Sequence, residues 1–161
     1  MAIYMHIEGI QGTVKANGFQ NWIELSGSEF AGVNTDVRTP TGRIQNRVLS
    51  LPHFGNFKLR KRTDDSSVKL FQAAYNAKVF PKITLAHVST GNGVKMYNQY
   101  KLTNAIISHF YEFHDEAMEF PVEELVLNYE TIEKTFVPRL SDNTAGTPMI
   151  GGYNVEKAEA L

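Results

Sequence analysis

Residues 63–78 decide the fold: Thr-Asp-Asp-Ser-Ser-Val-Lys-Leu-Phe-Gln-Ala-Ala-Tyr-Asn-Ala-Lys. Apolar side chains recur there at helical spacing and form one stripe, made of Leu70, Phe71, Ala74 and Ala77. Thr63 or Asp64 is suited to cap the amino end. Pro81 is expected to end the helix, because proline does not continue a helical hydrogen-bond ladder. The stretch predicts a helix over about residues 64–77 whose apolar face needs a partner.

The flanking segments favour strands, because apolar residues recur there at a period near two. The predicted strands are 3–7, 21–25, 48–51, 54–62, 83–88, 94–102, 105–113, 122–129 and 131–137. Residues 89–93, Ser-Thr-Gly-Asn-Gly, predict a tight hairpin turn. A bulge is expected at Thr103-Asn104, and Trp22 is expected to anchor the core. The prediction is a mainly β fold, an antiparallel barrel or sandwich of about eight or nine strands with one flanking helix.

Long loops separate several of these strands. Residues 26–46 show no regular pattern, and loops of that length usually bind something. Residues 115–121 form an acidic loop, and residues 138–152 are expected to be irregular. Residues 153–161 form a short tail that is either an edge strand or disordered.

Composition describes an ordinary folded domain. The 161 residues are expected to form one domain, with 42% hydrophobic and 20% charged residues. No apolar run approaches the roughly 20 residues of a membrane-spanning helix, so membrane insertion is not expected. The amino terminus reaches a charge before a signal-peptide core, which predicts synthesis in the cytoplasm without classical export. The absence of cysteine excludes disulfides and thiolate chemistry.

No group of residues in the sequence has the types and spacing of a catalytic site. His109 and His114 lie five apart near Asp115 and Glu116, but that spacing places the two imidazoles on opposite faces of a strand. His87 is interpreted as a hydrogen-bonded face residue. No Gly-x-Ser-x-Gly motif occurs, and Gly91-Asn92-Gly93 lacks the lysine and helix of a phosphate loop. We therefore expect no catalytic residue, cofactor or metal, and no enzyme activity.

Two charged stretches are candidate contact sites. The basic one contains Lys58, Arg60, Lys61 and Arg62, beside the aromatic residues Phe54 and Phe57. Such a cluster suits single-stranded nucleic acid, although a formal net charge of −1 argues against that partner. Alternatively, the acidic stretch 115–124 of a neighbouring copy, which includes Glu116, Glu119 and Glu123, meets the basic stretch. Charge reversal at Arg60 and Lys61 would then weaken self-association.

Three pieces, in this order, resemble the haemolysin-coregulated protein (Hcp) family, the tube protein of bacterial type VI secretion. They are residues 3–12 with 21–25; residues 63–75 with 80–85; and residues 123–137 with Gly151-Gly152-Tyr153-Asn154. The resemblance spans nearly the whole chain. Two departures occur: residues 26–46 lack the glycine runs of some members, and Tyr153 replaces a tryptophan often found near the carboxyl end.

The resemblance implies a β-barrel that assembles as a hexameric ring with an open lumen, and rings that stack into a tube inside a contractile sheath. Sheath, spike and effector proteins are the implied partners, and the protein is implied to leave the cell without a signal peptide. The candidate ring or stacking contacts are Lys58, Arg60, Lys61, Arg62, Glu116, Glu119, Glu123 and Tyr153. The alternative is a monomeric small barrel that binds a small ligand or single-stranded nucleic acid.

Overall fold

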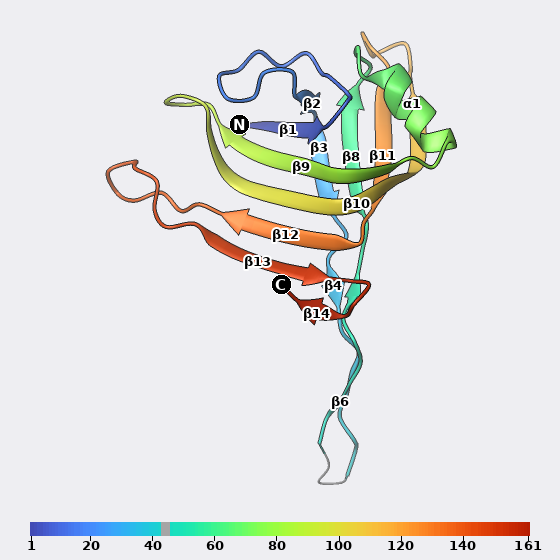
Figure 1. The fold of residues 1–161 in the computed structure, drawn as a ribbon, viewed down its shortest axis with the longest axis vertical. Helices are drawn as coiled ribbons and strands as arrows, with labels where there is room; N and C mark the ends of the chain where they lie inside the picture. The colour runs from blue at the N-terminus through green and yellow to red at the C-terminus, as the bar shows by residue number, and fades with distance from the viewer. Residues whose placement is uncertain (43–45) are drawn as a thin grey trace.

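The computed structural model describes residues 1–42 and 46–161 (Figure 1). The regular elements within these residues are antiparallel strands and one helix, α1. This confirms the predicted fold class. The elements are β1 (Ala2–Ile7), β2 (Ile23–Leu25), β3 (Gly27–Phe30), β4 (Val33–Asn34), β5 (Val37–Arg38), β6 (Val48–Leu49), β7 (His53–Phe54), β8 (Phe57–Arg62), α1 (Ser67–Tyr75), β9 (Val79–Ser89), β10 (Lys95–Phe113), β11 (Val122–Asn128), β12 (Thr131–Phe136), β13 (Met149–Asn154) and β14 (Glu159–Ala160).

Strand β10 belongs to two halves of the sheet. Its first half lies between β9 and β12, and its second half pairs with β11. The changeover lies at Asn104, whose φ is +49°. The predicted bulge at Thr103-Asn104 is wrong, because the register with β9 continues from Thr103 to Ala105; the shifts lie at Met96/Asn98 and Ile107/His109. The predicted hairpin between β9 and β10 is confirmed.

Residues 23–30 close the barrel. Strand β2 pairs with β1, whereas β3, which follows after Ser26, pairs with β8 at the other end of the sheet. The Ser26 backbone N–H donates to the Arg60 carbonyl at 2.8 Å, so the crossing itself is hydrogen-bonded. The interior is filled by fully buried side chains, among them Met5, Ile23, Leu59, Leu85, Leu102 and Leu125. One sheet folded onto itself in this way needs no second sheet to cover its apolar face.

The helix is shorter than predicted, and a different side of it faces the core. Leu70 and Ala73 are buried against the core, whereas Phe71 and Ala77 of the predicted stripe are exposed. Ala77 has a φ of +48° and ends the helix, so Pro81 lies inside β9 instead of stopping the helix. Proline is tolerated there because β1 pairs with β9 only from Ile83 onward.

At two places on the edges of the fold, the structure also differs from what the sequence predicted. Trp22 is half-buried and packs on Phe19, with ring centroids 5.0 Å apart, in a satellite cluster outside the main core. It is therefore not the predicted core anchor, because residues 8–22 cover the outer side of β1. At the carboxyl end, β13 begins within the segment predicted to be irregular, and β14 pairs with it as an edge strand.

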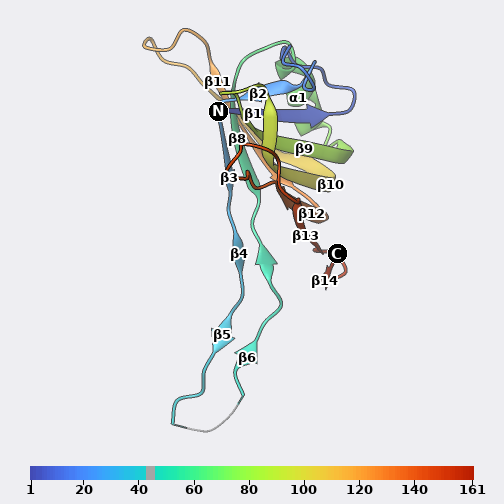
Figure 2. The same cartoon turned by 90° about the vertical axis from the view of Figure 1, so that its left-hand side faces the viewer.

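Residues 31–42, which lie within the segment 26–46 predicted to be an irregular loop, provide one side of a long two-stranded projection. We call residues 31–42 and 46–56 the arm. Strand β4 pairs with β7 and β5 with β6, and backbone bonds such as Ser50 N–H to the Asp36 carbonyl, 3.0 Å, connect the pairs. Figures 1 and 2 show the arm extending well beyond the barrel. No helix among the described residues has the length and apolar character needed to cross a membrane.

Candidate functional site

The basic and acidic stretches meet within one chain. Strands β8 and β11 pair so that Arg60 lies opposite Glu124 and Lys61 opposite Glu123. The Arg60 Nε lies 3.1 Å from Glu124 Oε2, and the Lys58 Nζ lies 3.9 Å from Glu124 Oε1. These two pairs are exposed at their cationic ends, and such pairs contribute little to stability.

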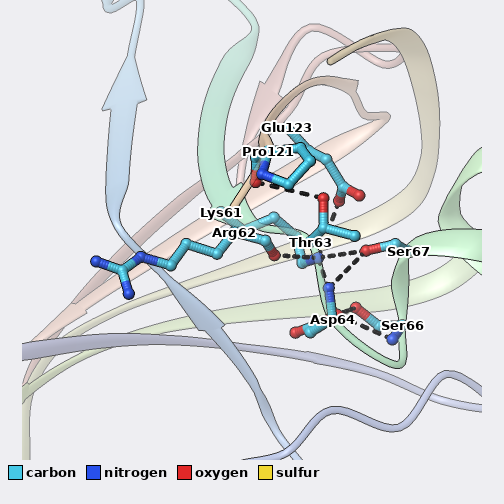
Figure 3. A network of polar contacts seen from close by, with 8 residues as sticks. All are labelled: Lys61, Arg62, Thr63, Asp64, Ser66, Ser67, Pro121 and Glu123. Atoms are coloured by element: carbon cyan, nitrogen blue, oxygen red, sulfur yellow. Dashed lines mark hydrogen bonds and ion pairs between the residues drawn. The ribbon is translucent and has the colours of Figure 1, made fainter. Parts of the chain in front are cut away.

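Lys61 is the centre of a buried polar network (Figure 3). Its ammonium group lies 2.9 Å from both Glu123 Oε2 and Asp64 Oδ1, and it also donates to Ser67 Oγ and the Arg62 carbonyl. The Lys61 and Glu123 side chains have no exposed surface. The network attaches the start of α1 to the sheet. It also leaves neither Lys61 nor Glu123 accessible to a neighbouring copy, contrary to the predicted contact role of these two residues.

The same network fixes the start of α1. The Asp64 Oδ1 accepts the Ser66 backbone N–H at 2.9 Å, and Ser67 Oγ accepts the Asp64 backbone N–H at 2.9 Å. This reciprocal arrangement satisfies donors that a helix start leaves open. Asp64 thus takes a capping role, as predicted, although the residue at the cap position is Ser66.

A groove lies between α1 and the second half of β10. Its volume is about 470 Å³, and we call it the α1 groove; its lining consists of Thr63, Ser67, Val68, Phe71, Phe110, Glu112 and Glu123. Val68 is 66% exposed and Phe71 is 53% exposed, and the Phe71 ring packs on Phe110 at 5.6 Å between centroids. The groove is thus apolar along α1 and carries two carboxylates on the sheet side.

The other predicted contact residues are dispersed. Arg62 is exposed beside Asp64, and Glu116 and Glu119 lie in the exposed loop between β10 and β11. Tyr153, in β13, stacks on Phe54 with ring centroids 4.8 Å apart, at the base of the arm. Together with Lys58 and Arg60, these four residues keep their contact role as a prediction.

Histidines do not gather into a metal site in the described part of the chain, where no cluster of three metal-ligating side chains occurs. His87 instead lies in a polar cluster at one end of the barrel. Its Nε2 is 3.0 Å from Ser28 Oγ, and its Nδ1 is 3.2 Å from the Asn98 side-chain nitrogen. The prediction that His87 is a hydrogen-bonded face residue is confirmed. Burial lowers the pKa of His87; a hydrogen bond with the Asn98 backbone opposes this, and the Lys134 charge adds to it.

We expect the stability of the fold to fall on acidification because of His87. The pKa of His87 is lower in the folded state than its ordinary value of 6.5, so below about pH 6.5 the unfolded chain binds the proton more readily. The contribution is therefore complete above that pH and is lost as the pH decreases toward the folded-state pKa. Urea unfolding between pH 7.5 and 5, in steps of about half a unit, measures this.

His87→Gln is expected to flatten that pH dependence relative to the parent chain, whereas His53→Gln, at an exposed site on the arm, should leave it unchanged. Equal slopes for the parent chain and His87→Gln would contradict the assignment.

Comparison with known proteins defines the class. The family model described as type VI secretion system effector, Hcp, matches residues 4–136. The chain therefore belongs to the Hcp family of type VI secretion proteins. Among curated proteins, no sequence matches this chain.

Solved structures share the fold. One described as a type six secretion system protein has a TM-score of 0.92 at 20% identity and covers 99% of both chains. Hcp1 from Salmonella typhimurium has a TM-score of 0.76 at 17% identity, covering 99% of this chain and 98% of its own. A type VI secretion system effector from Yersinia pestis has a TM-score of 0.65 at 18% identity, covering 95% of this chain and 99% of its own.

Proposed function

We propose that this protein is the tube subunit of a type VI secretion system. In this proposal six copies close into a ring, rings stack into a tube, and the lumen carries effectors outward as the tube is expelled. Membership of the Hcp family supports the assignment. The observation that carries it is the arm, a strand pair that the barrel does not cover and that exposes Val33, Val37, Leu49 and Leu51. Exposed apolar side chains on such a projection are typical of a surface that contacts another molecule.

A second surface supports assembly. Strands β12 and β13 expose Phe136, Met149 and Ile150, which are 40%, 58% and 66% exposed. With Lys134 and Gly151 these residues line a shallow hollow of about 320 Å³. Two separate apolar surfaces, the arm and this β12–β13 face, suit a protein that makes one kind of contact around a ring and another between rings.

The proposed partners follow from this role. They are other copies of the chain, the sheath around the tube, the spike at its end and the effectors in its lumen. The protein would be made in the cytoplasm and exported without a signal peptide. The same proposal assigns no enzyme activity, no cofactor and no binding of nucleic acid.

The mass and shape of the purified protein test the proposal. Light scattering after size exclusion is expected to give six times the chain mass of 18.1 kDa, and negative-stain images should show rings with a central hole. Ile150→Lys is expected to reduce the ring fraction, because it places a charge in the β12–β13 face. Lys15→Glu, at an exposed site on the amino-terminal loop, is the matched control.

A monomer across a wide concentration range would overturn the obligate-ring proposal. The alternative, a small barrel that binds a small ligand or single-stranded nucleic acid, would then be tested by salt-dependent retention on single-stranded DNA.

A further inference from the structure

The turn between β9 and β10 contains a reactive pair of residues, Asn92 and Gly93. Both are exposed at the tip of this turn. In such a pair the backbone nitrogen of the glycine can attack the side-chain amide carbon of the asparagine, because glycine has no β-carbon to obstruct the approach. Asparagine is one of the thermolabile residue types in proteins. The tip of the hairpin therefore has the chemistry needed for spontaneous deamidation.

A second Asn-Gly pair, Asn17-Gly18, gives the chain an internal comparison. Both asparagines are exposed. The two glycines have nearly the same backbone conformation, with a φ of +83° at Gly18 and +80° at Gly93. The dipeptide sequence, its exposure and the conformation of the glycine therefore do not distinguish the two sites.

The surroundings of the first pair hold it in place. Residues 17–18 form the middle of a turn that is closed by the Phe19 backbone N–H, which donates to the Ala16 carbonyl at 2.9 Å. The Phe19 ring packs on Tyr4 and Trp22, with ring centroids 5.4 Å and 5.0 Å apart. Rotation of the backbone toward the reactive geometry would break this hydrogen bond and displace the ring. The turn therefore opposes the reaction.

The turn around Asn92 lacks such an anchor. The ladder between β9 and β10 ends before residues 90–94. Among the described residues, no turn hydrogen bond comparable to that of Phe19 fixes this segment. Glycine lies on both sides of Asn92, and a β-carbon at Gly91 or Gly93 would meet no other atom within 4 Å. The backbone here is thus free to rotate until the nitrogen reaches the amide carbon.

We propose that Asn92 is a site of spontaneous deamidation and that the fold protects Asn17. The Gly93 nitrogen forms a bond to Cγ of Asn92, and the bond between Cγ and Nδ2 breaks. The amide group leaves as ammonia and takes the proton of the Gly93 nitrogen. Water then opens the five-membered imide. Cleavage between the nitrogen and Cγ gives aspartate, whereas cleavage between the nitrogen and the backbone carbonyl carbon gives isoaspartate.

The products change the hairpin in two ways. Each adds a carboxylate to a chain whose formal net charge is −1. The new charge lies two residues from Thr90, whose Oγ1 accepts a hydrogen bond from the Met1 ammonium group at 3.2 Å. Isoaspartate also inserts a methylene group into the backbone of the turn, and turn length sets the register of a hairpin. The protein therefore accumulates, with age, molecules in which this hairpin is altered.

Timed incubation of the purified protein at mildly alkaline pH tests the proposal. Samples are digested, and the peptides that contain Asn17 and Asn92 are separated and quantified by mass spectrometry, with isoaspartate detected by enzymatic methylation. We expect Asn92 to deamidate several-fold faster than Asn17. Asn92→Gln is expected to abolish the reaction at this position, because the longer side chain closes an imide ring much more slowly.

Two controls separate the effect of the fold from that of the dipeptide itself. In concentrated urea both turns are open, so the two asparagines are expected to react at similar rates. Phe19→Ala removes the ring that anchors the first turn, and it is expected to raise the rate at Asn17 without changing the rate at Asn92. Equal rates at the two sites in the folded protein would overturn the proposal. A difference that persists in urea would overturn the protective role of the first turn.

Discussion

Replacing Lys61 by methionine is expected to lower the free energy of unfolding by about 3–5 kcal/mol. The ammonium group is fully buried and lies 2.9 Å from the carboxylates of both Glu123 and Asp64. Its removal leaves Glu123 as a buried charge without its cation, and it also removes the link between the sheet and Ser67 of α1. Urea unfolding at neutral pH, followed by tryptophan fluorescence and circular dichroism, measures the change.

Two variants make this prediction specific. Lys58→Met removes a cation that is 44% exposed and lies 3.9 Å from Glu124, so its effect should be below about 1 kcal/mol. The double variant Lys61→Met, Glu123→Leu is expected to recover much of the lost stability, because it replaces a buried ion pair with apolar side chains. A loss for Lys61→Met no larger than for Lys58→Met would show that the network does not stabilise the fold.

Phe57→Ala is expected to destabilise the fold by about 3–5 kcal/mol, the usual range for a buried aromatic residue. Phe57 is 1% exposed and begins β8, where the arm joins the barrel. Its ring stacks on Phe30 at 4.9 Å and packs edge-on against Tyr100 at 5.0 Å and Tyr129 at 6.0 Å. The substitution therefore leaves a cavity lined by three aromatic rings.

Thermal and urea unfolding measure the effect of Phe57→Ala. Phe113→Ala is the matched control, because Phe113 is 43% exposed at the end of β10 and should change stability by less than about 1 kcal/mol. Because Phe30 and Phe57 form the base of the arm, the Phe57→Ala protein should also assemble less well at concentrations where the parent chain forms rings. Similar losses of stability at both positions would contradict the assigned core role of Phe57.

Sequence patterns predicted the elements that have a buried side. The β9–β10 hairpin was predictable because Asn92-Gly93 lies between two alternating segments, and alternation arises when one face of a strand is buried. The position of the helix along the chain was predictable, but the side of the helix that faces the core was not. Its nine residues, Ser67–Tyr75, present only about two turns, and apolar side chains on both sides allowed the wrong stripe to be chosen.

The first side of the arm, and its pairing with the second, could not be predicted in this way. Strands β4 and β5 bury no face, so their side chains are under no pressure to alternate between apolar and polar. The first side of the arm lies in residues 26–46, which were predicted to be an irregular loop, whereas on the second side strands were predicted at 48–51 and from Phe54 onward. Backbone hydrogen bonds between residues distant in sequence hold the two sides of the arm together. A local sequence pattern gives no information about such bonds.

The buried network did leave a signal in the sequence. Phe57, Leu59 and Lys61 alternate along β8, so Lys61 occupies a core-facing position. Glu123, Leu125 and Leu127 do the same along β11. Two charges of opposite sign at core-facing positions of neighbouring strands indicate an internal ion pair. The prediction of contact residues considered only charge, and it therefore placed Lys61 and Glu123 together with their exposed neighbours.

The closure of the barrel also determines when the chain folds. Strand β1 pairs with β9, whose residues follow some 80 positions later, and β8 pairs with β11 at a comparable separation. Such distant pairings make folding slow, in the range of milliseconds to seconds, because large loops are ordered before any contact compensates. During synthesis β1 and β8 therefore each lack one of their two partner strands until β9 and β11 have left the ribosome. In that interval β1, β2 and β8 present open strand edges to other nascent chains, which makes the unfinished protein a natural client of chaperones.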